Sequence, residues 1–344
     1  MKIFKSLFHT STLLLLLVLV SACSNNVPLQ TPTEPTMDVN IAIVEETESV
    51  IKPTQTSTPL KFVVFTQNLE NYDPAGQISA EIETYAIINN LIFEKMEFSP
   101  DLDFSQISRA LIFHPSDDVL QNIQNKAETT FIIITEKDIQ PSDHLIVLKE
   151  EPANIVFMAG YIGEVVAEDW RLGGLLPQIN FQNTPANTVF YNGGKYFCGL
   201  CAPIYAPVVF FPVTANLSNS GDPNTAENAF TEISNNYLNA LFVPSAYLND
   251  IFATNLKQNG ILILSDLSES HPLYDFVDIS IFFDYRASIQ SVLDNHTGST
   301  AGVHPVNIQI SSPTGKLTSG KAEVVQDVLQ DLIDGYISPY TVSE

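Results

Sequence analysis

The feature that most constrains the fold is the order of apolar segments after residue 60. Short apolar runs of strand length alternate with segments in which apolar residues recur at helical spacing. The strand-length runs are apolar at successive positions, so both faces of each strand are expected to be buried. Such strands are typical of parallel sheets that helices cover on both sides. The sequence therefore predicts an α/β fold.

The first half of the pattern predicts four strands and two helices. The strands are expected at residues 61–65, 110–113, 130–134 and 145–148. One helix is expected at 117–125. The other should present an apolar face formed by Ile78, Ile82, Tyr85, Ile88 and Ile92.

The second half repeats the alternation. Strands are expected at residues 172–176, 188–191, 240–243 and 261–264. Helices are expected at 153–168, from 224 onward, between the last two strands, and at 323–334. Gly335 should stop the last helix. Two α/β lobes in series account for this arrangement.

The amino terminus has the features of an export signal. Lys2 and Lys5 precede an apolar run at residues 13–20, which is shorter than the roughly 20 residues needed to span a bilayer. The sequence Leu-Val-Ser-Ala-Cys, ending at Cys23, resembles the lipobox of bacterial lipoproteins. The resemblance implies that residues 1–22 are a signal peptide and that Cys23 carries acyl chains. An ordinary secretory signal is the alternative.

The segment that follows is expected to be a tether. Residues 23–59 are rich in Thr and Pro, and such a composition favours an extended chain because proline withdraws backbone donors and polar residues bury little. A short apolar patch at 39–44 is either a local strand or without structural meaning.

Charge excludes one class of partner. The chain has 39 Asp and Glu against 15 Lys and Arg, a formal net charge of −24. No basic stripe is present to release counterions from a phosphate backbone, so nucleic-acid binding is not expected. The same acidity disfavours adsorption to anionic lipid, so membrane attachment would depend on Cys23.

The segments from residue 130 onward follow a specific order. They are a strand at 130–135, a strand ending in charged residues at 145–151, Ala-Gly-Tyr within 157–162, a strand at 172–176, Asn-Gly-Gly at 192–194, a strand ending in Asp at 262–266, and a helix ending in glycine within 331–337. This order resembles the type I periplasmic-binding fold, and within it the basic-membrane-protein (BMP) family of lipoproteins.

The resemblance implies two doubly wound parallel-sheet lobes joined by a hinge. Lobe 1 would comprise residues 60–150 and 280–298, and lobe 2 residues 151–279 and 299–344. Solute-binding members of the family serve ABC importers. We therefore expect a lipid-anchored extracytoplasmic monomer that captures a small polar ligand between its lobes and hands it to an ABC permease of a bacterial membrane. A nucleoside is the first expected ligand, and a sugar or another polar metabolite is the next.

In such a fold, ligands bind where loops follow the carboxyl ends of parallel strands. Asp266 is expected to accept hydrogen bonds from ligand hydroxyls, because the matching Asp of nucleoside-binding relatives suggests that role. His114 and Glu136 also follow lobe 1 strands. Each candidate could instead be a turn or packing residue. The predicted ligand-binding residues are Asn68, Ser116, Asn192, Tyr196, Ser245, Tyr247 and Asp266.

Cys198 and Cys201 have C-x-x-C spacing. An oxidising compartment favours a short structural disulfide, and free thiols, redox exchange or half of a metal site are the alternatives. No second C-x-x-C completes a four-ligand set, so no metal is expected. The usual nucleophile, zinc-protease and dinucleotide motifs are absent, so neither catalysis nor a cofactor is expected.

Three loops depart from the family pattern. Residues 66–71 lack the usual Gly, Asp and Ser, residues 195–201 have no familiar counterpart, and residues 244–247 replace a glycine-rich turn. These departures favour an alternative function. The chain could be a surface lipoprotein that keeps the fold and acts as a sensor or a protein-binding module, with an enzyme as the third possibility.

Overall fold

The computed structural model describes residues 59–206, 209–218, 224–294 and 301–341. The predicted signal peptide, Cys23 and the tether lie outside these ranges, except for Pro59. Within the described ranges, none of the helices combines the length and hydrophobicity needed to cross a bilayer.

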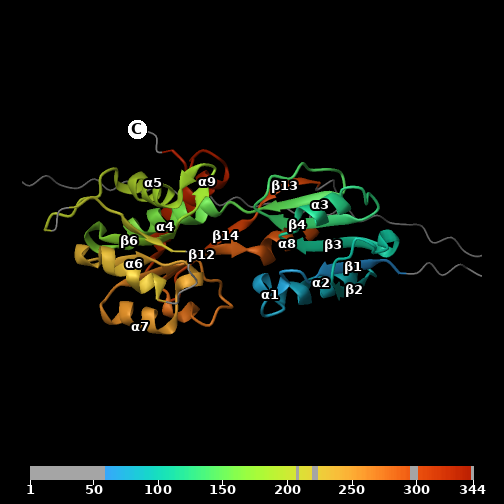
Figure 1. The fold of residues 1–344 in the computed structure, drawn as a ribbon, viewed down its shortest axis with the longest axis horizontal. Helices are drawn as coiled ribbons and strands as arrows, with labels where there is room; N and C mark the ends of the chain where they lie inside the picture. The colour runs from blue at the N-terminus through green and yellow to red at the C-terminus, as the bar shows by residue number, and fades with distance from the viewer. Residues whose placement is uncertain (1–58, 207–208, 219–223, 295–300, 342–344) are drawn as a thin grey trace, which may run out of the picture. The chain divides into compact units, whose positions relative to one another are not determined.

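Two six-stranded sheets organise the described residues (Figure 1). The first, which defines lobe 1, has the strand order β13 (Gly302–Pro305), β5 (Leu145–Lys149), β4 (Thr130–Thr135), β3 (Ile107–Phe113), β1 (Lys61–Phe65) and β2 (Ile92–Met96). The second, which defines lobe 2, has the order β14 (Asn307–Ser311), β12 (Ile279–Asp284), β11 (Leu262–Ser265), β10 (Ala240–Phe242), β6 (Leu172–Pro177) and β9 (Val213–Leu217).

Helices accompany both sheets. Those of lobe 1 are α1 (Leu69–Tyr72), α2 (Gln77–Ile88), α3 (Asp117–Ile123) and α8 (Tyr285–Asp294). Those of lobe 2 are α4 (Pro152–Val166), α5 (Ala186–Cys198), α6 (Thr225–Ile233), α7 (Asp250–Gln258) and α9 (Ser319–Ile333). A small antiparallel hairpin, β7 (Asn180–Phe181) with β8 (Thr184–Pro185), follows β6.

The lobe 1 sheet is parallel throughout, and its four central strands, β5, β4, β3 and β1, are largely buried on both faces. Along β4, Phe131 and Ile133 join one hydrophobic cluster while Ile132 and Ile134 join the other, as the strand's period of two requires. The lobe 2 sheet is parallel except for the antiparallel pairing of β12 with β14. The predicted fold class, two parallel α/β lobes, is confirmed.

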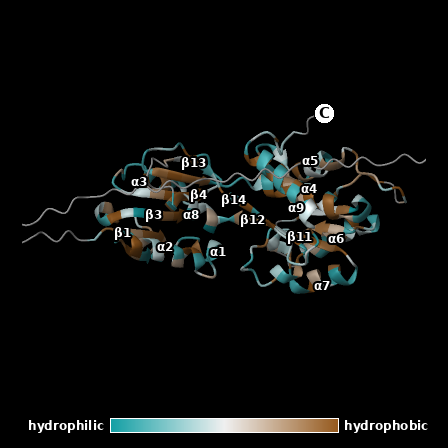
Figure 2. Ribbon diagram, turned by 180° about the vertical axis from the view of Figure 1, so that it is seen from behind, coloured by the Kyte–Doolittle hydropathy of each residue, from teal (hydrophilic) through white to brown (hydrophobic). Residues whose placement is uncertain are grey.

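Helix α7 is amphipathic. In α7, Phe252 and Leu256 are buried against the lobe 2 core while Ile251 is exposed. Figure 2 shows this helix as alternating hydrophilic and hydrophobic stretches of ribbon. Burial of the apolar face holds the helix on its sheet.

The chain passes between the lobes after β5, after β12 and after β13. The first crossing lies where the sequence predicts it, but the other two come later than predicted. Ile279 pairs with Leu264 of β11, so β12 stays in the lobe 2 sheet through Asp284. Val303 pairs with Val147 of β5, so β13 belongs to lobe 1 although it was expected in lobe 2.

Two local predictions are wrong. Residues 188–191 are helical in α5 instead of forming a strand. Ile92 does not extend the helical face, because α2 ends at Ile88 and a turn through Asn90, which has a φ of 55°, brings Ile92 into β2 beside Lys61.

Gly193 and Gly194 lie within α5. A Cβ on Gly193 would overlap the backbone carbonyl oxygen of Phe157 in α4, and a Cβ on Gly160 of α4 would overlap that of Phe190 in α5. The two helices therefore touch backbone to backbone, which only glycine permits at these positions.

Candidate functional site

The loops after β10 and β11 meet because the two strands are parallel neighbours. Ser245 lies in the short 3₁₀ turn Ser245–Tyr247 after β10, and Asp266 follows β11 directly. The backbone N–H of Ser245 donates a hydrogen bond to Oδ1 of Asp266. These two predicted site residues are thus brought together at the carboxyl end of the lobe 2 sheet.

Both residues line a cavity of about 440 Å³ that side chains of both lobes enclose. Lobe 2 contributes Phe181, Phe242, Ser245, Asp266 and His271, among others. Lobe 1 contributes Asn71, Tyr72, Glu136 and Tyr285. Its volume suits a small metabolite, and its lining combines aromatic rings with a few polar groups, as ligand sites commonly do. We call it the interlobe cavity.

Contacts between aromatic rings position the side chains that lobe 1 contributes to the interlobe cavity. Tyr72 at the end of α1 stacks on His114 with 4.6 Å between ring centroids, and it meets the Tyr285 ring edge-on at 5.4 Å. Burial, followed by the nearby Glu150 and Glu136 carboxylates, raises the pKa of Tyr72 to about 12. Its hydroxyl therefore keeps its proton at neutral pH and can donate a hydrogen bond.

A buried carboxylate supports these side chains from behind. Glu150, only 2% exposed, follows β5 and accepts a hydrogen bond of 2.6 Å from the Tyr285 hydroxyl. The other carboxylate oxygen of Glu150 lies 3.0 Å from Nε2 of His114. Burial and Glu150 raise the pKa of Tyr285, so this hydrogen bond persists at neutral pH. Tyr285 begins the chain after one lobe crossing and Glu150 precedes another, so the contact ties two of the crossing segments together on the lobe 1 side.

The charge of the interlobe cavity is one-sided. Glu136 and Asp266 line it, and none of its described lining residues is Lys or Arg. A ligand phosphate or carboxylate would meet like charge there, which costs binding free energy. Neutral or cationic ligands that donate hydrogen bonds are compatible with this lining.

A second cavity, of about 540 Å³, lies at the carboxyl end of the lobe 1 sheet and shares Glu136 with the first. Asn68 and Ser116 line it. The Asn68 side-chain amide donates to the carbonyls of Phe113 and His114, each at 3.4 Å, and Ser116 Oγ caps α3. Both predicted residues therefore hold loops in place here.

Three other predicted residues lie outside the lining of both cavities. Asn192 and Tyr196 belong to α5, so the strand that was expected to place them does not exist. Asn192 is buried and donates to the Pro339 carbonyl at 3.0 Å, and Tyr196 packs near Phe157. Tyr247 packs against the lobe 2 core.

Sequence reasoning missed Tyr72, His271 and Tyr285. Tyr285 directly follows β12, whose segment at 279–283 is apolar except for Ser280 and is a strand signal that would have pointed to it. His271 is oriented by the backbone N–H of Leu273, which donates to its Nδ1 at 3.1 Å. No sequence motif marks this histidine.

No protein-family model and no curated protein matches the chain. Solved structures do match it in fold. A transcriptional activator of the comK gene from Bacillus halodurans has a TM-score of 0.58 at 11% identity, covering 82% of this chain and 100% of its own. An ABC transporter solute-binding protein from Conexibacter woesei has a TM-score of 0.54 at 9% identity, with coverages of 81% and 98%. One from Aeropyrum pernix has a TM-score of 0.51 at 11% identity, with coverages of 83% and 94%.

At these identities the likeness concerns the fold. The chain has the type I periplasmic-binding fold, which it shares with solute-binding proteins of ABC transporters and with a regulator. These neighbours are named as binding proteins or as a regulator, and none is named as an enzyme.

Proposed function

We propose that this chain is a lipid-anchored extracytoplasmic solute-binding protein of the BMP kind, which captures a small uncharged polar ligand between its lobes for an ABC permease. A nucleoside is the first candidate ligand. Cys23 would carry the anchor and residues 23–59 would tether the lobes to the membrane. Neither catalysis nor a cofactor is part of this function.

The interlobe cavity carries the proposal. Its aromatic walls offer faces for a planar base, and the Asp266 carboxylate offers an acceptor for sugar hydroxyls. A ligand that touches Tyr72 and Asp266 touches both lobes, so it would bind the closed arrangement more tightly than an open one. Two neighbours in fold are solute-binding proteins of ABC transporter systems, which is compatible with this use.

A thermal-shift screen tests the proposal. The full chain carrying Cys23→Ser, which removes the acylation site, would be screened against nucleosides, bases, sugars and amino acids. A ligand at about 100 times its dissociation constant stabilises the folded state by about 2.7 kcal/mol, enough to raise the melting temperature visibly. We expect a nucleoside to give this shift. A well-folded protein that no compound stabilises would contradict the proposal.

One observation favours a second function, a protein-binding module of the same fold. Large apolar side chains between residues 196 and 210 are exposed: Tyr196, Phe197, Leu200, Ile204, Tyr205 and Phe210. Exposed apolar surface of this kind often marks contact with another protein. Under this alternative, no compound in the screen stabilises the protein, and substitution of Ile204 and Tyr205 by Ser abolishes binding of a protein partner. Under the transport proposal, ligand binding survives that substitution.

A further inference from the structure

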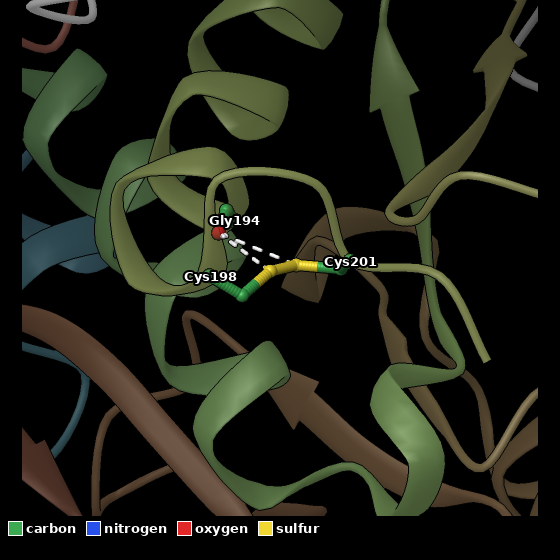
Figure 3. Close-up of a disulfide and its surroundings, with 3 residues drawn as sticks. All are labelled: Gly194, Cys198 and Cys201. Carbon is green, nitrogen blue, oxygen red and sulfur yellow. Dashed lines mark hydrogen bonds between the residues drawn. A yellow bond between two sulfur atoms is a disulfide. The ribbon is translucent and has the colours of Figure 1, made fainter. Parts of the chain in front are cut away.

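Glu164 of α4 lies beside the C-x-x-C pair. Cys198 is the last residue of α5, and Cys201 is paired with Phe211, whose N–H donates to the Cys201 carbonyl at 2.8 Å. One carboxylate oxygen of Glu164 and the two Sγ atoms all lie within 4.8 Å of one another. In the structure the two sulfurs are joined as a disulfide, with Cα atoms 5.5 Å apart (Figure 3).

The Glu164 carboxyl group is buried without a partner. The residue is 1% exposed, and neither carboxylate oxygen accepts or donates a hydrogen bond within the described residues. Buried polar groups are nearly always paired, so an orphaned carboxyl group aimed at two sulfurs requires an explanation. Glycine at 194 leaves room for it, because a Cβ there would come within 3.2 Å of Glu164 Cγ and closer still to Pro212.

The surroundings favour a cation over an isolated thiolate. The carbonyl oxygen of Gly194, near the end of α5, lies 3.6 Å from Cys198 Sγ and 3.7 Å from Cys201 Sγ (Figure 3). A carbonyl oxygen this close, one turn from the C-terminal end of α5, carries partial negative charge, which attracts a cation and disfavours a free thiolate. These surroundings therefore do not favour thiol–disulfide exchange, which depends on a stabilised thiolate.

We propose that Glu164, Cys198 and Cys201 form a binding site for a thiophilic divalent cation such as Zn²⁺ when the Cys198–Cys201 disulfide is reduced. Two sulfur ligands and one carboxylate oxygen match the ligands that Zn²⁺ takes, and three protein ligands leave a fourth position for water. This site lies in lobe 2, away from the interlobe cavity, and does not depend on the ligand bound there.

The chemistry balances with a dithiol as reductant. The dithiol supplies two electrons and two protons, which break the S–S bond and give two thiols, and the dithiol itself becomes a disulfide. The metal ion then displaces the two thiol protons and the carboxyl proton, which leave to solvent. Disulfide and metal exclude each other, because a sulfur in the S–S bond has no thiolate charge to give to the ion.

Cobalt binding tests the site. The full chain carrying Cys23→Ser, so that no third thiol competes, would be reduced with excess dithiol, desalted under nitrogen and titrated with Co²⁺ and then Zn²⁺. We expect one Co²⁺ per chain with sulfur-to-cobalt charge-transfer absorption, displaced by Zn²⁺. The oxidised protein should show no such absorption.

Variants assign the ligands. Glu164→Gln should weaken Zn²⁺ binding by at least about tenfold. Glu168→Gln, which changes an exposed carboxylate just past the end of α4, should leave it unchanged. Cys198→Ser should abolish the charge-transfer absorption. Reduced protein without that absorption would overturn the proposal, as would equal Zn²⁺ affinity of the Glu164→Gln and Glu168→Gln variants in chains whose circular dichroism shows native folding.

Discussion

Asp266 is positioned by the backbone of the neighbouring loop. The Ser245 N–H donates to its Oδ1, so the carboxylate is already oriented when a ligand arrives. We expect Oδ2 to be the oxygen that accepts from ligand hydroxyls. Orientation before binding lowers the entropy cost of association. This residue was predicted from its place after a strand, and the structure puts it on the wall of the interlobe cavity.

Asp266→Asn should weaken ligand binding by at least about tenfold, or about 1.4 kcal/mol. The amide oxygen still accepts from Ser245, so the loop stays folded while the charged acceptor is lost. Calorimetry with the compound that stabilises the protein most measures the effect. Asp275→Asn, which changes an exposed carboxylate outside the cavity lining, is the matched control. Equal affinities in the two variants would remove Asp266 from the site.

Glu164 should make the stability of the oxidised protein depend on pH. Burial raises its pKa from the ordinary 4.5 to about 9. Between these values the folded state keeps a proton that the unfolded state releases, so the free energy of unfolding falls as pH rises, by at most about 1.4 kcal/mol per unit.

Glu164→Gln should remove this slope. Urea denaturation of oxidised, chelator-treated protein at several values between about pH 5 and 9 measures it. The Glu168→Gln variant should keep the slope of the parent chain. A parent slope that survives in Glu164→Gln would show that another group causes it.

Tyr285→Phe should destabilise the folded chain by about 1–3 kcal/mol, since it leaves buried Glu150 without one of its donors. Tyr336→Phe removes the same hydroxyl from a residue that is 81% exposed, and it should change stability by less than about 0.5 kcal/mol. Denaturant titration compares the two. Similar losses would mean that the hydrogen bond from Tyr285 to Glu150 does not stabilise the fold.

At the scale of elements, the contact of α4 with α5 is the most demanding part of lobe 2. Gly193→Ala places a methyl group against the Phe157 carbonyl, so the helices must separate, at a cost of roughly 1–3 kcal/mol or more. Gly320→Ala in α9 meets open space and should be neutral or stabilising by up to about 1 kcal/mol. Melting temperatures of the two variants decide it. An unchanged Gly193→Ala protein would contradict the close contact.

Most strands and helices could be predicted from the sequence. Strands that are buried on both faces appear in it as short, continuous apolar runs, and the helices between them show apolar residues at helical spacing. The strand expected at 188–191 could not be told from a helix in this way. Val189 and Phe190 are apolar and would fit a buried strand or a buried helix equally well. The helix is selected by packing against the distant α4, where Gly160 leaves room for the Phe190 backbone. Asn192 and Tyr196 were misplaced for the same reason.

At the scale of the whole molecule, the two-lobed architecture was predictable, but the later lobe crossings were not. An apolar run of strand length indicates that a strand is present. Which sheet contains the strand depends on pairing with strands far away in the sequence, as for β12 and β13. The candidate site could be predicted from the sequence only in part. Ser245 and Asp266 come from neighbouring strands of one lobe, whereas Tyr72 and Tyr285 reach the cavity through contacts between segments far apart in the sequence.

The central claim is that the interlobe cavity binds an uncharged polar ligand. Calorimetric titration with the most stabilising nucleoside and with its 5′-monophosphate, on the full chain carrying Cys23→Ser, tests it most directly. The carboxylates of Glu136 and Asp266, with no Lys or Arg in the described lining, predict saturable heat for the nucleoside and none for the nucleotide. Binding of the monophosphate as tight as that of the nucleoside, or no binding of either, would contradict the account.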